Sequence, residues 1–112
     1  MKTTIVEQSG VIVVEVEGRM DAGNAQAFED VCKEQLAAGV QNLVIDFAGV
    51  EYTSSAGLRG ILVVAKAAKA NKASLVICDL QPQVNEVFTI SGFMSILAIH
   101  KTRQEAITSL MP

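Results

Sequence analysis

The chain has 112 residues, the length of one domain, and half of them are apolar although only 4% are aromatic. This composition predicts a core of aliphatic side chains and excludes an intrinsically disordered chain. Nine Lys and Arg against twelve Asp and Glu give a net charge of -3 with no basic block, so nucleic-acid binding has no electrostatic support. We expect a single domain over residues 1–112.

Cysteine and histidine are too few and too widely spaced for a zinc site. Cys32 and Cys78 share no CxxC spacing, and His100 is the lone histidine. Both cysteines fall in apolar segments, where buried thiols are expected. The amino terminus lacks a secretory-signal pattern, and the longest uncharged run, residues 87–99, is too short to cross a bilayer. We predict a cytoplasmic protein with no cofactor, no metal and no membrane partner.

The first half of the chain predicts two strands, a helix and a third strand. In VIVVEVEG the alternation at the end predicts that Val14 and Val16 face the core. Asn24 is a candidate cap for the helix, and Gly39 is the expected stop after it. The predicted elements are strands over 3–8 and 11–18 joined by a turn at Ser9-Gly10, a helix over 24–38, and a buried strand over NLVIDF, residues 42–47.

The second half alternates helices with strands. The predicted elements are a loop over 48–55, a helix over 56–70, a strand over 73–80, a helix that begins at Pro82 and ends at Gly92, a strand over 95–100, and a final helix capped by Thr102. The order is ββαβαβαβα. Strands that alternate with helices pair in parallel through right-handed crossovers. We therefore predict an α/β fold with a mostly parallel sheet, an antiparallel strand at its start and about four helices.

Three hydroxyl side chains, Thr53, Ser54 and Ser55, precede the helix predicted over 56–70. Sites in open α/β sheets lie beyond the carboxyl ends of the strands, and this turn is such a place. A serine there can cap free backbone amides. A phosphate there would meet unpaired N–H donors and the positive end of the helix dipole. The position alone is compatible with a structural cap and with a regulated hydroxyl.

The helix over 56–70 carries apolar residues on two faces. Leu58, Ile61, Leu62 and Ala65 recur at helical spacing and are predicted to face the core. On the opposite face, flanked by Arg59 and Lys66, we then expect the small or apolar residues Gly60, Val63 and Ala67. Such a face indicates either an alanine-rich surface helix or a docking face for another protein.

The motif YTSSAGLR after the VID strand is the most specific part of a resemblance to the STAS domain of bacterial anti-sigma factor antagonists, also called anti-anti-sigma factors. The flanking residues, from NLVIDF to ISGF, resemble the same family, and VIVVEVEGRMDAGNAQAFEDV is similar to its start. The resemblance covers nearly the whole chain. The α/β order predicted above agrees with the fold that the family implies.

The resemblance implies a partner switch. The unphosphorylated domain binds a cognate anti-sigma factor, which is also a serine kinase of the GHKL type, and this binding frees a sigma factor. The kinase phosphorylates a serine at the helix start, the phosphorylated domain dissociates, and a PP2C-type phosphatase resets it. A STAS relay that controls a non-transcriptional output, such as secretion or motility, is the alternative within the same fold.

Matching AGL to the family places the phosphoacceptor at Ser55, with Ser54 as the second candidate and Thr53 as the third. Many members have an aspartate where this chain has Ser54, so the carboxylate that would orient the hydroxyl is missing. Asp21 and Asp46 match acidic positions that the family shows near the site. The partner-binding residues implied by the resemblance are Asp21, Asp46, Thr53, Ala56, Gly57, Arg59, Gly60 and Val63.

A small serine hydrolase is the alternative from another class of protein. Ser55, Asp79 and His100 follow the chain order of hydrolase triads, and TSSAG is one glycine short of the G-x-S-x-G elbow. Thr53 replaces the first glycine, the chain is short for a hydrolase, and no HGGG-type oxyanion loop is present. We therefore predict that the chain is not an enzyme.

Overall fold

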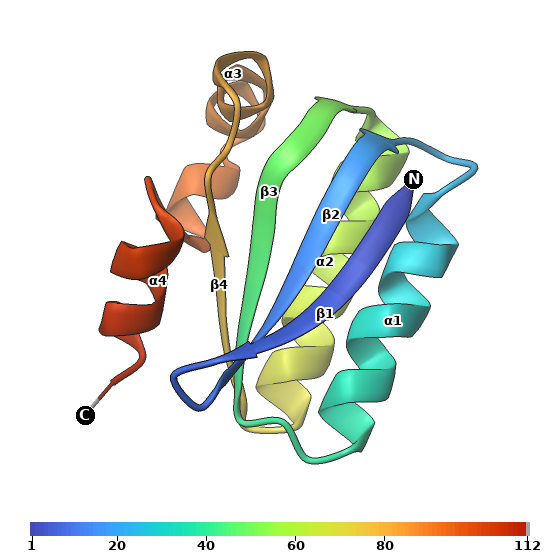
Figure 1. Ribbon diagram of the computed structural model, residues 1–112. Helices are drawn as coiled ribbons and strands as arrows, with labels where there is room; N and C mark the ends of the chain where they lie inside the picture. The colour runs from blue at the N-terminus through green and yellow to red at the C-terminus, as the bar shows by residue number, and fades with distance from the viewer. Residues whose placement is uncertain (112) are drawn as a thin grey trace.

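Five strands form one sheet in the order in which they occur along the chain (Figure 1). The computed structural model describes residues 1–111, so Pro112, the last residue of the predicted domain, lies outside the described residues. The strands are β1 (Lys2–Gln8), β2 (Val11–Met20), β3 (Asn42–Thr53), β4 (Ser74–Cys78) and β5 (Ala98–His100). β1 is antiparallel to β2, and the other neighbours are parallel, which confirms the predicted mixed sheet.

Helices cover both faces of this sheet. α1 and α2 lie side by side on one face, and α4 lies on the other (Figure 1). Right-handed crossovers between neighbouring parallel strands place successive helices on the same face. The helices are α1 (Ala25–Ala37), α2 (Ser55–Ala70), α3 (Pro82–Ile90), a single 3₁₀ turn η1 (Phe93–Ser95) and α4 (Arg103–Ser109). The predicted order ββαβαβαβα is therefore confirmed.

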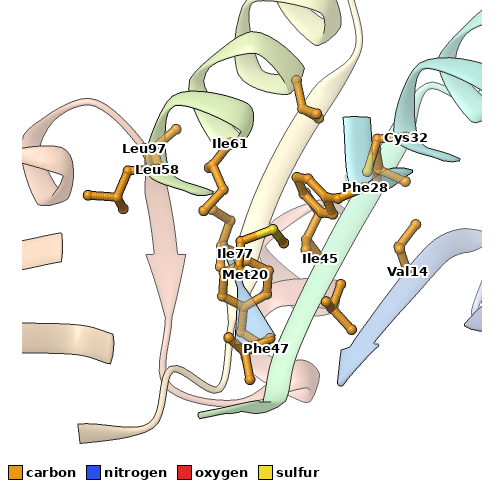
Figure 2. Close-up of a cluster of buried hydrophobic side chains, with 14 of the residues drawn as sticks. Val14, Met20, Phe28, Cys32, Ile45, Phe47, Leu58, Ile61, Ile77 and Leu97 are labelled. Carbon is orange, nitrogen blue, oxygen red and sulfur yellow. The ribbon is translucent and has the colours of Figure 1, made fainter. Parts of the chain in front are cut away.

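The main core lies between the sheet and the pair α1 and α2. Figure 2 shows side chains from both helices meeting those of the strands around Phe47. Edge-to-face contacts extend this core: Phe47 lies 6.3 Å from Phe28 of α1 and 6.3 Å from Phe88 of α3, measured between ring centroids. Such aromatic pairs add about 1 kcal/mol each beyond the area that they bury. They tie α3 to the same core as α1.

A second, smaller core lies under α4. Val14 and Val16 face the main core as predicted, but Val11 and Val13 of the same strand are buried as well. Their side chains lie on the face of the sheet that α4 covers, in one cluster with Ala106 and Ile107 of that helix. A strand covered on both faces has no need for alternating polar residues. This explains why β2 begins as a continuous apolar run.

β3 is longer than predicted. Residues 48–53 were expected to form a loop, but they continue the strand, because they pair with the last residues of β2 from Glu17 to Met20. The register shifts between Glu15 and Glu17 and again after Gly18, so the pairing is irregular. β4 and β5 are shorter than predicted. None of the helices within residues 1–111 is long and apolar enough to cross a membrane.

Candidate functional site

The three hydroxyl residues lie where β3 passes into α2. Thr53 ends the strand, Ser54 is the N-cap, and Ser55 is the first residue of the helix. The Ser54 Oγ accepts a hydrogen bond from the backbone N–H of Gly57 at 3.1 Å, and the backbone N–H of Ser54 donates to the Met20 carbonyl at 2.9 Å. Ser54 therefore fixes the start of α2 and anchors it to the end of β2.

Ser55 differs from its neighbours because its side chain is free. Thr53 is only 4% exposed and Ser54 is half-buried, whereas Ser55 is exposed. The Thr53 hydroxyl donates to the Ser54 carbonyl at 3.4 Å. The Ser55 hydroxyl forms no hydrogen bond with any residue of the described chain. Of the three candidates, Ser55 presents the accessible hydroxyl.

Two glycines bring α2 close to its neighbours. A Cβ atom on Gly57 would lie 2.2 Å from the Met20 carbonyl oxygen and 2.7 Å from the Thr53 Oγ1. A Cβ atom on Gly60 would lie 3.3 Å from the Cβ of Ala25 in α1. Both glycines are buried. The prediction that Gly60 faces outward is wrong, because α1 packs against that side of α2.

The inward face of α2 also differs from the prediction. Leu58 and Ile61 are buried as expected, and Leu62 and Ala65 are half-buried and pack against the same core. Val64 and Ala68, which were not predicted to face inward, are buried as well. Neighbours on two sides, the sheet and α1, widen the covered part of the helix. The exposed side that is left near the hydroxyl cluster consists of Ser55 and Arg59, with Ala56 and Val63 half-buried beside them.

Asp21 lies beside the hydroxyl cluster, in the loop between β2 and α1. Its neighbour Met20 receives the hydrogen bond of Ser54. The Asp21 carbonyl accepts hydrogen bonds from the backbone N–H groups of Asn24 and Ala25, and its carboxylate accepts one from Gly23 at 3.1 Å. Asn24 is the N-cap of α1 by position, although its side chain donates to the Arg19 carbonyl instead of capping. Asp21 organises this loop and is half-exposed.

A cation–π pair at the ends of β2 and β3 was not predicted from the sequence. The Arg19 guanidinium lies 4.1 Å from the centroid of the Tyr52 ring, and its Nε lies 3.9 Å from the Asp21 carboxylate. Tyr52 is 40% exposed. The two residues are directly opposite in the register of β2 and β3. Because that part of β3 was expected to be a loop, no pattern in the sequence placed them together.

Asp46 does not belong to the hydroxyl cluster. It precedes Thr53 by seven positions in the same strand, a separation of about 23 Å at roughly 3.3 Å per residue. It is 6% exposed and lies on the α4 side. Its Oδ2 accepts hydrogen bonds from the Arg103 Nε at 2.9 Å and Nη2 at 2.7 Å, and its Oδ1 accepts one from the Ala48 N–H. This aspartate anchors α4, so its expected place near the phosphoacceptor is wrong.

Arg103 joins three side chains under α4. Besides Asp46 it contacts the Glu15 carboxylate, and its Nη1 donates to the Gln8 Oε1 at 3.3 Å. The hydrogen bond to Glu15, with that to Asp46, raises the pKa of Arg103. The arginine therefore links α4 to β1, β2 and β3. This cluster is a structural ion-pair network.

The acidic group around Cys78 is a poor candidate for a metal centre. Ligand atoms of Asp46, Cys78 and Asp79 lie within 4.8 Å of one another. The Arg103 guanidinium already neutralises Asp46. Burial, together with the charge of Asp46, raises the pKa of the Cys78 thiol well above its usual range, so the thiol stays protonated and binds cations weakly.

The hydrolase alternative has no support in the geometry. Asp79 and His100 lie next to each other at the ends of β4 and β5, where the Asp79 N–H donates to the His100 carbonyl at 3.3 Å. No side-chain hydrogen bond joins Ser55, Asp79 and His100 within residues 1–111. A nucleophile and its base are expected within hydrogen-bond reach. A groove of about 520 Å³ lies between α3, η1 and β5 and contains none of the three hydroxyl residues.

Known proteins are similar to this chain in sequence and in fold. BtrV of Bordetella bronchiseptica, which is assigned by name to the anti-sigma factor antagonists, is 38% identical over 106 residues, which cover 95% of this chain and 91% of BtrV. An anti-sigma factor antagonist from Mycobacterium paratuberculosis has a similar structure, with a TM-score of 0.88 and 24% identity over 97% of this chain and 92% of that one.

A third similar structure is that of SpoIIAA of Bacillus in its phosphorylated form. Its TM-score is 0.72 at 17% identity, and the match covers 98% of this chain and 100% of SpoIIAA. Identity this low establishes the fold alone. The model of the STAS domain matches residues 2–106 of this chain. The chain therefore belongs to the STAS domain family.

Proposed function

We propose that this chain is an anti-sigma factor antagonist whose binding to its partner is switched off by phosphorylation of Ser55. The observation that carries the proposal is the free, exposed hydroxyl of Ser55 at the first residue of α2, directly after a serine that is occupied as the helix cap. The 38% identity to BtrV supports the class of protein. The phosphorylated form of SpoIIAA supports the kind of modification.

Electrostatics explains why phosphorylation at this position would act as a switch. The transfer forms a bond between the Ser55 Oγ and the γ-phosphorus of ATP, breaks the bond to the bridging oxygen of ADP, and releases the hydroxyl proton. The product carries about -1.5 to -2 charges at neutral pH. An interface that accepts a neutral hydroxyl would then have to desolvate a dianion, which costs several kcal/mol unless cations neutralise it.

The partners in this proposal are those that the family resemblance implies. In the proposed cycle the unmodified chain binds an anti-sigma factor that is a serine kinase of the GHKL type, and this binding releases a sigma factor in the cytoplasm. A PP2C-type phosphatase restores the hydroxyl. The surface in contact with the kinase contains Ser55, Ala56, Arg59 and Val63 of α2, and Asp21 in the loop before α1. The chain itself acts as a binding protein and catalyses no reaction.

The proposal is tested by identifying the partner and mapping the phosphate. A pull-down with the unmodified chain should recover a kinase, and incubation with that kinase and ATP should add one phosphate at Ser55, located by mass spectrometry. Ser55→Ala should abolish labelling and keep binding, whereas Ser55→Glu should weaken binding at least tenfold, or about 1.4 kcal/mol. Ser54→Ala is the matched control and should still be labelled at Ser55. Normal labelling of Ser55→Ala would show that another residue is the acceptor.

A further inference from the structure

Arg59 lies one helical turn after Ser55 on the exposed side of α2. Residues four positions apart in a helix are neighbours, with about 5–6 Å between their Cβ atoms. Long side chains in a helix also point back toward its amino terminus, so an arginine covers the turn that precedes its own Cα. Ala56, three positions before Arg59, has only a methyl group and leaves room for the guanidinium. The guanidinium can therefore reach the Ser55 hydroxyl.

Arg59 is also the one arginine that forms no ion pair among residues 1–111. The chain has three arginines. Arg19 contacts Tyr52 and Asp21, and Arg103 pairs with Glu15 and Asp46. Arg59 forms no ion pair or hydrogen bond with any other side chain of residues 1–111. An exposed guanidinium that forms no ion pair within residues 1–111 is available either to a binding partner or to an anion created beside it.

We propose that the phosphoryl group on Ser55 forms an ion pair with Arg59 and thereby withdraws this cation from the docking surface. This inference rests on the proposed function, because it requires Ser55 to be the phosphoacceptor. In the unmodified protein Arg59 is free to pair with an acidic group of the partner. After phosphorylation the same guanidinium binds the phosphoryl oxygens in the fork geometry that suits them. One modification thus adds a dianion and removes a cation at the same place.

The pair can be detected in the isolated chain, without kinase or partner. Phosphoserine is incorporated at position 55 during translation, and the second ionisation of the phosphate, near pH 6, is followed by ³¹P NMR. A neighbouring cation favours the dianion and lowers the pKa of the phosphate. Arg59→Gln should therefore raise this pKa by about half a unit relative to the phosphorylated parent. Arg59→Lys, which keeps the charge, should restore most of the difference.

Lys66→Gln is the matched control. It removes one positive charge from an exposed position of the same helix, about 16 Å from Ser55 at 1.5 Å per residue. At 0.1 M salt this distance exceeds the Debye length of about 10 Å, so the pKa of the phosphate should not change. Equal pKa values in the parent, Arg59→Gln and Lys66→Gln would overturn the inference. Equal affinity of the partner for the phosphorylated and unmodified chains would instead overturn the proposed function, and the NMR result would still decide whether the pair forms.

Discussion

The middle of β3 and the turn that follows its end both carry polar side chains, but the hydrogen bonds of these side chains differ. In the middle, the buried carboxylate of Asp46 is bound by Arg103 and by the Ala48 N–H. At the end, Ser54 is occupied as a cap while Ser55 has no hydrogen-bond partner in the described chain. A satisfied polar group stabilises the fold, and a free one is available for chemistry. This difference separates the structural aspartate from the candidate phosphoacceptor.

The largest effect is expected at the contact that holds the end of β3 in place. Gly57→Ala would put a methyl group 2.2 Å from the Met20 carbonyl oxygen, and we expect a loss of about 3 kcal/mol in the free energy of unfolding. Urea unfolding followed by circular dichroism measures this loss. Gly60→Ala is the matched control. Its nearest contacts are 3.3 Å away, so its stability should stay within about 1 kcal/mol of the parent. Equal stability of the two variants would contradict the close approach at Gly57.

The second effect concerns the middle of β3. Arg103→Gln would leave the Asp46 carboxylate buried without a cation. Because the Arg103 side chain is 26% exposed, we expect a loss of about 2 kcal/mol, less than for a fully buried pair. Glu15→Gln removes the more exposed partner of the same arginine and should cost about 0.5 kcal/mol. Chemical unfolding at pH 7 compares the two variants. If Arg103→Gln and Glu15→Gln lowered the free energy of unfolding equally, the buried Asp46 would depend on the arginine no more than the more exposed Glu15 does.

The third effect is a loss of stability at alkaline pH, which reaches about 1.4 kcal/mol at pH 10. Burial raises the pKa of the Cys32 thiol from 9.0 to about 12. The folded state keeps the proton while the unfolded chain loses it. The contribution of this thiol to the free energy of unfolding is therefore fully present below pH 9. It is lost between pH 9 and 12, by about 1.4 kcal/mol per pH unit. Urea unfolding from pH 7 to 11 should show this decline, and Cys32→Ala should reduce its slope. An unchanged slope would mean that Cys32 does not contribute.

The smallest effect compares the two serines directly. Ser54→Ala removes the helix cap and should lower the free energy of unfolding by about 1 kcal/mol. Ser55→Ala removes a hydroxyl with no partner and should change stability by less than about 0.5 kcal/mol. Thermal unfolding of the two variants in the same buffer is sufficient. A larger loss for Ser55→Ala than for Ser54→Ala would mean that Ser55, and not Ser54, stabilises the start of α2.

The sequence predicted the order of the elements well because its signals are local. Apolar runs, the glycine after α1, Pro82 at the start of α3 and Thr102 as the cap of α4 each act within a few residues, and the structure has all of them. The hydroxyl cluster was also found from local pattern, because a serine before an apolar helical stripe marks a helix start.

Other features depended on pairing between distant segments. Ala48 and Gly49 have low strand propensity, so the second half of β3 was expected to be a loop, yet pairing with β2 makes it a strand. The same pairing brings Arg19 onto Tyr52. The role of Asp46 depends on Arg103, 57 positions later in the chain. No periodicity within one element reports such contacts.

By itself the sequence determined the α/β order, the family resemblance and the position of the hydroxyls at the start of a helix, because propensity, capping and periodicity act over short stretches of chain. The tertiary structure alone decided which polar groups have hydrogen-bond partners and which residues are buried. It buried Gly57, Gly60 and Asp46 and left Ser55 and Arg59 exposed one turn apart on α2. Burial and hydrogen-bond partners are properties of segments that meet in space.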